Sequence, residues 1–151
     1  MRLMMKKLAT PNTTKMLNTL SLTLVSLMLL GASSQTFASA KKGPAPDFTL
    51  ASKQGGNIRL QEQLGNVVLV NFWASWCSSC AKALPLFNHW DHALGEDFVV
   101  ISVNVDEDIS DGLDMATKLQ LDFPIAYDKS LSVAKMYQAS VLPTSFIIDK
   151  S

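Results

Sequence analysis

Two long apolar runs in the middle of the chain predict buried strands. Val67–Ala74 is almost continuously apolar, and Phe98–Val105 is a second run of the same kind. Such runs are typical of strands buried on both faces of a sheet. Before them, Asp47–Ala51 alternates as a strand does, Gln54–Asn57 supplies a turn and Ile58–Leu60 returns, which predicts an N-terminal β-hairpin.

Helical spacing of apolar residues follows each long run. The first predicted helix is Ser78–Leu94, and Pro85 inside it should kink it because proline removes one backbone donor. Leu113, Ala116 and Leu119 form the apolar stripe of the second predicted helix.

The last third of the chain continues the same alternation. Phe123–Asp128 is predicted to be extended, Leu131–Tyr137 to be a short helix and Ser145–Asp149 to be a strand. Alternating strands and helices favour an α/β domain with a central sheet flanked by helices.

An acidic cluster follows the second long strand. It consists of Asp106, Glu107, Asp108 and Asp111. A calcium loop would have Gly at its sixth position and Glu at its twelfth, whereas counting from Asp106 these are Asp111 and Thr117. We interpret the cluster as a solvated loop and the start of a helix.

Residues 1–40 have the pattern of an export signal. Basic residues and no acid are followed by the apolar stretch 17–32, and Ala38–Ala40 fits the rule for signal cleavage. A retained membrane anchor is the alternative, although that stretch is shorter than the roughly 20 residues that span a bilayer. Residues 41–46 are predicted to be a linker and residues 47–151 one domain.

The export signal changes the charge balance of the remaining chain. The whole sequence has 13 basic and 13 acidic residues, but four of the basic ones lie in residues 1–40. The remainder has 9 basic and 13 acidic residues, a net charge of −4. A mildly acidic domain lacks the basic surface that nucleic acid requires, so we expect no nucleic-acid partner.

The only two cysteines, Cys77 and Cys80, follow the first buried strand directly. Ser75 and Ser78 are candidate caps for the next helix, which places Cys77 at a helix N-terminus. Helix N-termini stabilise anions, and the thiolate is the form of cysteine that attacks disulfides. We therefore predict that Cys77 is the nucleophile and that Cys80, about one helical turn later, resolves the mixed disulfide.

Other uses of the two cysteines fit less well. Zinc would need further ligands, and His89 and His92 lie too far along the predicted helix from Cys80 to share a metal with it. A c-type haem site needs His directly after the second cysteine, where Ala81 stands. A peroxidase usually has Thr or Ser at the position of Ala74. A purely structural disulfide between Cys77 and Cys80 would close so short a loop that it would add little to the stability of the fold.

Four motifs together resemble one family. Trp73–Cys80 (WASWCSSC) is similar to the redox signature of thioredoxin-fold proteins, and Pro44–Leu50 (PAPDFTL) resembles the leading motif of their TlpA/ResA-like and redoxin branch. Val103–Glu107 resembles the segment after that branch's second core strand, and Val141–Thr144 (VLPT) its cis-proline loop. The resemblance extends from Pro44 to the end of the chain and implies a thioredoxin-like fold.

The resemblance implies roles for residues around the two cysteines. The Leu142–Pro143 bond should be cis, with Pro143 packed on the dithiol and the backbone of Leu142 open to a substrate strand. The residues between the cysteines should tune the reduction potential through thiolate stabilisation. The expected environment of Cys77 and Cys80 is Trp76, Ser78, Ser79, Leu142, Pro143 and Thr144.

The function that follows is an exported, periplasmic thiol–disulfide oxidoreductase that acts on protein thiols or disulfides without a cofactor or metal. The resemblance favours a reductase of the cytochrome c maturation type, kept reduced by a membrane partner; the protein itself would be bound to the membrane only if its leader is retained. Two alternatives stay open. One is a non-catalytic copper-binding protein that uses the two soft thiolates, and the other is an inactive truncated product.

The sequence also departs from the family pattern. It stops at Ser151, before the last edge strand and C-terminal helix, so we expect an incomplete domain. Asn71 stands where thioredoxins often bury an Asp, and Ala83 where ResA-like reductases carry Glu. Without these acids, proton transfer from Cys80 must use water or another group.

Overall fold

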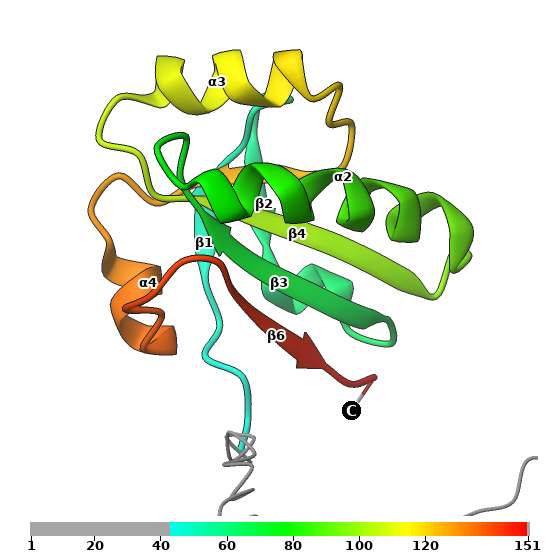
Figure 1. Cartoon of the computed structure of the whole chain (residues 1–151). Coiled ribbons are helices and arrows are strands. Elements are labelled where there is room, and N and C mark those ends of the chain that lie inside the picture. The colour runs from blue at the N-terminus through cyan, green and yellow to red at the C-terminus, as the bar shows by residue number, and fades with distance from the viewer. Residues whose placement is uncertain (1–42, 151) are drawn as a thin grey trace, which may run out of the picture. The chain divides into compact units, whose positions relative to one another are not determined.

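A mixed sheet of four strands forms the centre of the structure (Figure 1). Its order is β5-β4-β3-β6, with β3 at Val67–Trp73, β4 at Phe98–Asn104, β5 at Ile125–Tyr127 and β6 at Thr144–Ile148. β4 is parallel to β3 and to β5, whereas β6 runs antiparallel to β3. Both long apolar runs are therefore central strands, as their sequence predicts.

Helices cover both faces of this sheet (Figure 1). On one face lie α2 at Ser78–Ala93 and α3 at Ile109–Lys118, and on the other lies α4 at Ser132–Tyr137. Alternate residues of β3 point to opposite faces, so Leu69 and Trp73 pack with α2 while Phe72 packs with α4.

An N-terminal hairpin lies beside β5. β1 at Thr49–Ala51 pairs antiparallel with β2 at Asn57–Arg59, and the 3-10 helix η2 follows at Leu60–Gln63. The hairpin turn is hydrogen-bonded to β5, where the Lys53 backbone N–H donates to the Ile125 carbonyl at 2.8 Å. The hairpin thus extends the domain beyond the edge of the sheet.

The computed structural model describes residues 43–150. Residues from Gly43 onward belong to one compact unit, so residues 43–46 of the predicted linker lie within it. The predicted export signal lies outside the described residues. Among the helices described, none combines the length and the apolar character needed to cross a membrane.

Tyr137 fastens the segment that leads into the hairpin. Its hydroxyl donates to the Pro46 carbonyl at 2.7 Å, and its ring packs against Phe48 with centroids 6.0 Å apart. Burial of the hydroxyl raises the pKa of Tyr137 from 10.0 to about 12, and the negative charge of the nearby Asp47 carboxylate contributes a smaller part of this increase.

This raised pKa predicts a loss of stability in alkali. Between pH 10 and about 12 the folded chain keeps a proton on Tyr137 that the unfolded chain has lost, so the free energy of unfolding falls as pH rises. Urea unfolding at a series of pH values should show this fall, and Tyr137→Phe should flatten it. A midpoint of Tyr137 ionisation near pH 10 in the folded chain, followed by tyrosinate absorbance, would contradict the expectation.

Candidate active site

The two cysteines lie at the junction between β3 and α2. β3 ends at Trp73, whose carbonyl accepts the backbone N–H of Val105 at 2.9 Å. The chain then turns, and the Cys77 backbone N–H donates to the Ala74 carbonyl at 3.1 Å. α2 begins immediately afterwards, at Ser78.

Cys77 itself is the N-cap of α2. Its Sγ accepts the backbone N–H of Cys80 at 3.2 Å, which is the bond that a capping side chain makes. The prediction that Ser75 or Ser78 caps this helix is therefore wrong. Sulfur takes that place because Cys77, with φ −89° and ψ 100°, is the last extended residue before the helix.

A disulfide joins Cys77 and Cys80, with 5.2 Å between their Cα atoms. The two positions differ in access to solvent, since Cys77 is 7% exposed and Cys80 is 0% exposed. When the bond is reduced, a thiolate at Cys77 would face the Cys80 N–H and lie near the Ser79 hydroxyl, 3.4 Å away in this structure. Both contacts favour the anionic form of the outer sulfur.

The other predicted residues of the CxxC segment lie at the surface. Trp76 is 73% exposed, and Ser78 and Ser79 are also exposed. The ring of Trp76 is therefore not part of the core.

The proline loop lies on the other side of the site. The Leu142–Pro143 bond is cis, and Leu142 packs against the apolar cluster that contains both cysteines. Thr144 begins β6 opposite Phe72, and its hydroxyl donates to the Val141 carbonyl at 2.5 Å. The loop thus contacts the cysteine cluster through Leu142 and the sheet through Thr144, whereas Pro143 between them is exposed.

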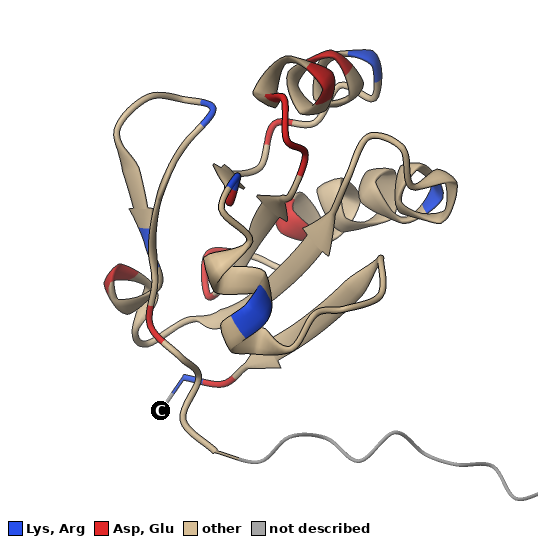
Figure 2. Cartoon of the chain, turned by 90° about the vertical axis from the view of Figure 1, so that its left-hand side faces the viewer, with Lys and Arg blue, Asp and Glu red and all other residues tan. Residues whose placement is uncertain are grey.

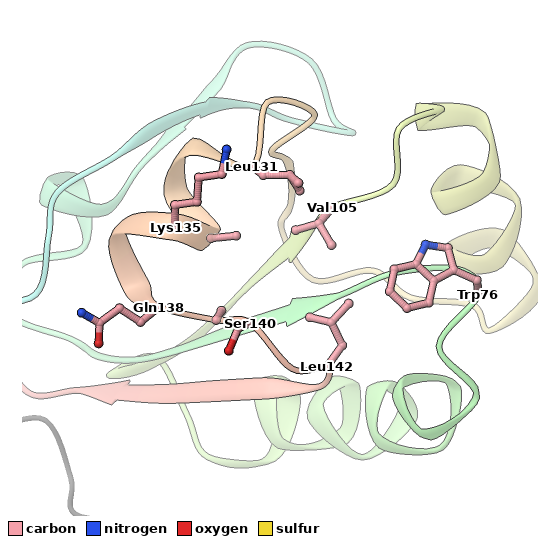
Figure 3. Close-up of a pocket in the computed structure, with 9 residues that line it drawn as sticks. Trp76, Val105, Leu131, Lys135, Gln138, Ser140 and Leu142 are labelled. Atoms are coloured by element: carbon pink, nitrogen blue, oxygen red, sulfur yellow. The ribbon is translucent and has the colours of Figure 1, made fainter.

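A pocket of about 500 Å³ connects these two sides (Figure 3). Its mostly apolar wall combines the segment before Cys77, the end of β4, helix α4 and the proline loop. Figure 3 shows Trp76 at one end and Leu142 below the cavity. The lining residues are Trp76, Val105, Leu131, Ala134, Lys135, Gln138, Ala139, Ser140 and Leu142.

Asp106 corrects our interpretation of the acidic cluster. It is only 3% exposed, whereas Glu107, Asp108 and Asp111 are exposed as expected. Figure 2 shows acidic residues crowded along the connection from β4 into α3. Asp106 points inward because both of its oxygens accept the backbone N–H of Ser75, at 3.1 and 2.9 Å, next to the CxxC segment.

Asn71 is buried beneath α2 at 1% exposure. Its Nδ2 donates to the Ser145 hydroxyl at 2.9 Å, while its Oδ1 has no partner among the described residues. Ser102 lies opposite Asn71 on β4, and its buried hydroxyl likewise lacks a partner there. This polar row holds no ionisable group, so it supplies no carboxylate for the proton of Cys80.

The remaining candidate ligands do not gather at the cysteines. His89 and His92 are exposed on α2, and His92 Nε2 lies 3.0 Å from the Asp122 carboxylate. Within residues 43–150, no group of three or more His, Cys, Asp or Glu side chains is placed to hold a metal ion.

Comparison with known proteins agrees with this geometry. The family model described as AhpC/TSA matches residues 42–151. The chain belongs to the AhpC/TSA family. The relatives of this family member include proteins named thiol-disulfide oxidoreductase ResA: that of Bacillus cereus is 35% identical over 107 residues, covering 70% of this chain and 62% of the relative. The ResA protein of Geobacillus thermodenitrificans is 33% identical over 139 residues, which cover 85% of this chain and 80% of the relative.

Solved structures confirm the thioredoxin-like fold of this AhpC/TSA family member. A putative thiol:disulfide interchange protein DsbE from Chlorobium tepidum superposes with a TM-score of 0.69 at 34% identity, covering 74% of this chain and 80% of that one. StoA from Bacillus subtilis gives 0.62 at 26% identity, covering 72% and 84%. The resemblance to ResA-like proteins is also confirmed, although the chain spans about 62% of the length of the first curated relatives.

Proposed function

We propose that this protein is a thiol–disulfide oxidoreductase whose Cys77–Cys80 pair exchanges electrons with protein substrates. One observation carries the proposal: the disulfide closes the first turn of α2 with Cys77 as the cap. A thiolate formed at that position is stabilised by the helix N-terminus, which makes it a nucleophile near neutral pH. The names of the relatives support the same activity.

The reduction of a substrate disulfide would take two exchange steps. The Cys77 thiolate attacks one sulfur of the substrate; a Cys77–substrate disulfide forms, and the other substrate sulfur leaves as a thiolate that takes a proton from water. Cys80 then loses its proton to water and attacks Cys77 Sγ, which releases the second substrate thiolate. Two electrons pass to the substrate, and the Cys77–Cys80 disulfide remains.

The shape of the site supports an extended polypeptide as the substrate. The pocket is large enough for an apolar side chain, and Trp76, the residue before Cys77, bounds it together with Leu142 (Figure 3). The backbone of Leu142, next to Pro143, would pair with the substrate strand and hold its disulfide over Cys77. Ser78, Ser79 and Thr144 complete the surroundings of the reacting sulfurs.

The leader and the resemblance to ResA-like reductases support the cellular part of the proposal. Residues 1–40 would export the chain to the periplasm, where it would act as a reductase in cytochrome c maturation. Disulfides persist in that oxidising compartment, so the reduced pair would have to be regenerated by a membrane electron donor.

A redox titration of the full chain in glutathione buffers tests the activity. Thiol alkylation and tryptophan fluorescence should follow one two-electron transition. A potential near −270 mV, as in thioredoxin, is expected for a reductase, and one near about −120 mV would instead indicate an oxidase. A chain that shows no reversible transition at any glutathione ratio would overturn the proposal.

A further inference from the structure

We propose that Asp106 is a positioning residue for the redox site, acting through a buried set of contacts that we call the Asp106 brace. The brace consists of Asp106, Asn104, Ser75 and Gly112. This inference rests on the proposed function, because its effect is on the chemistry of Cys77. The brace comes from three separate parts of the chain: the turn before α2, the end of β4 and the middle of α3.

Both Asp106 oxygens are occupied by donors. Oδ1 and Oδ2 share the Ser75 backbone N–H at 3.1 and 2.9 Å, and Oδ1 also accepts the Ser75 hydroxyl at 3.0 Å. Oδ2 accepts Asn104 Nδ2 at 2.7 Å. These donors satisfy both oxygens of a side chain whose residue is only 3% exposed.

The Asn104 side chain hydrogen-bonds to Asp106 and lies close to Gly112 of α3. Its Oδ1 accepts the Asp106 backbone N–H at 3.2 Å, so the two residues bond reciprocally. A Cβ added to Gly112 would lie 2.7 to 2.8 Å from the Asn104 amide atoms. Only glycine at position 112 therefore leaves the Asn104 amide where it is.

The brace acts on the segment that carries the chemistry. Ser75 lies two residues before Cys77 and directly before Trp76, while Val105 directly precedes Asp106. Trp76 and Val105 both line the pocket, so the brace ties two pocket walls together and fixes the turn that ends at the Cys77 cap. If the turn shifts, the N–H of Cys80 no longer faces Cys77 Sγ at 3.2 Å and the thiolate loses stabilisation.

Two variants weaken the brace and leave the Asp106 side chain in place. Gly112→Ala crowds Asn104, and Ser75→Ala removes only the hydroxyl donor. Thr117→Ala is the control, because Thr117 is exposed on the same helix and its hydroxyl bonds only to the Leu113 carbonyl. In the full chain, we expect both brace variants to shift the glutathione equilibrium three- to tenfold toward the disulfide, where tenfold corresponds to about 30 mV.

The pH dependence of Cys77 alkylation separates positioning from simple support of the fold. If the brace only stabilised the fold, the two variants would lower the stability of the oxidised and reduced forms alike. The potential and the alkylation midpoint would then stay unchanged. We expect the midpoint to move to higher pH in both brace variants and to stay in place in Thr117→Ala.

The outcomes distinguish this inference from the proposed function. If the wild-type chain titrates reversibly but the folded brace variants match Thr117→Ala within twofold, the inference is wrong and the proposed function stands. If the wild-type chain does not titrate, the proposed function fails first, and the inference fails with it. If Gly112→Ala does not fold, the glutathione equilibrium and alkylation midpoint of Ser75→Ala decide whether the inference holds, because that variant introduces no steric clash.

Discussion

Cys80→Ser is expected to accumulate mixed disulfides with substrate proteins, whereas Cys77→Ser is expected to form none. The reason is access to solvent: Cys77 is 7% exposed, whereas Cys80 is 0% exposed. Each variant should lower turnover of a protein disulfide by about 1000-fold or more, because the two sulfurs act as one unit. Non-reducing electrophoresis followed by mass spectrometry would identify the trapped adducts.

The matched control is the double variant with serine at both positions, which should trap nothing. Adducts that form in Cys77→Ser but not in Cys80→Ser would reverse the assignment of nucleophile and resolving thiol. This experiment is independent of the direction of electron flow, because either direction passes through a disulfide at the attacking sulfur.

Phe72→Ala should cause the largest loss of stability, about 3–5 kcal/mol. Phe72 is 0% exposed, and its ring centroid lies 5.4 Å from that of Tyr137 and 6.1 Å from that of Phe146. Its ring thus packs together β3, α4 and β6. Because whole domains are stable by only about 5–15 kcal/mol, this one truncation removes a large part of the total.

Ile147→Ala provides the comparison for Phe72→Ala. Ile147 lies on β6 and is 65% exposed, so removing its side chain should change the free energy of unfolding by no more than about 0.5 kcal/mol. Urea unfolding followed by circular dichroism would measure both. Equal losses in the two variants would mean that the aromatic cluster does not hold these elements together.

Much of the fold could be predicted because its elements carry strong local signals. The apolar run predicted as Val67–Ala74 is β3 at Val67–Trp73, and the helix predicted as Ser78–Leu94 is α2 at Ser78–Ala93. A strand buried on both faces has a continuous run of apolar residues. A helix buried on one side has apolar residues along that side only, at helical spacing. These patterns depend on neighbours in the sequence, so the sequence reports them directly.

The environment of Asp106 could not be predicted in this way. Within a run of acids after a strand, its local pattern is that of a solvated loop, and its partner Ser75 is 31 residues away. The available signal was the parallel pairing of the two long strands, which places the ends of Val67–Trp73 and Phe98–Asn104 side by side.

The pocket was missed for a similar reason. Trp76, Val105 and Leu142 come from three segments that only the folded chain brings together. The resemblance identifies Trp76 and Leu142 as neighbours of the cysteines, but Val105 belongs to a predicted strand and Leu131–Tyr137 is predicted only as a short helix. A sequence motif can identify single residues that line a pocket. The pocket itself depends on the volume that the folded helices, strands and loops leave between them.

The double duty of Cys77 has an evolutionary consequence. In the proposed function its sulfur reacts, and in the structure the same sulfur caps the N-terminus of α2. Serine is among the preferred residues at an N-cap. A single Cys-to-Ser change would therefore end the electron transfer yet preserve the helix start, the hollow beside Trp76 and the rest of the scaffold. One mutation therefore separates the proposed oxidoreductase from a redox-silent protein with the same scaffold.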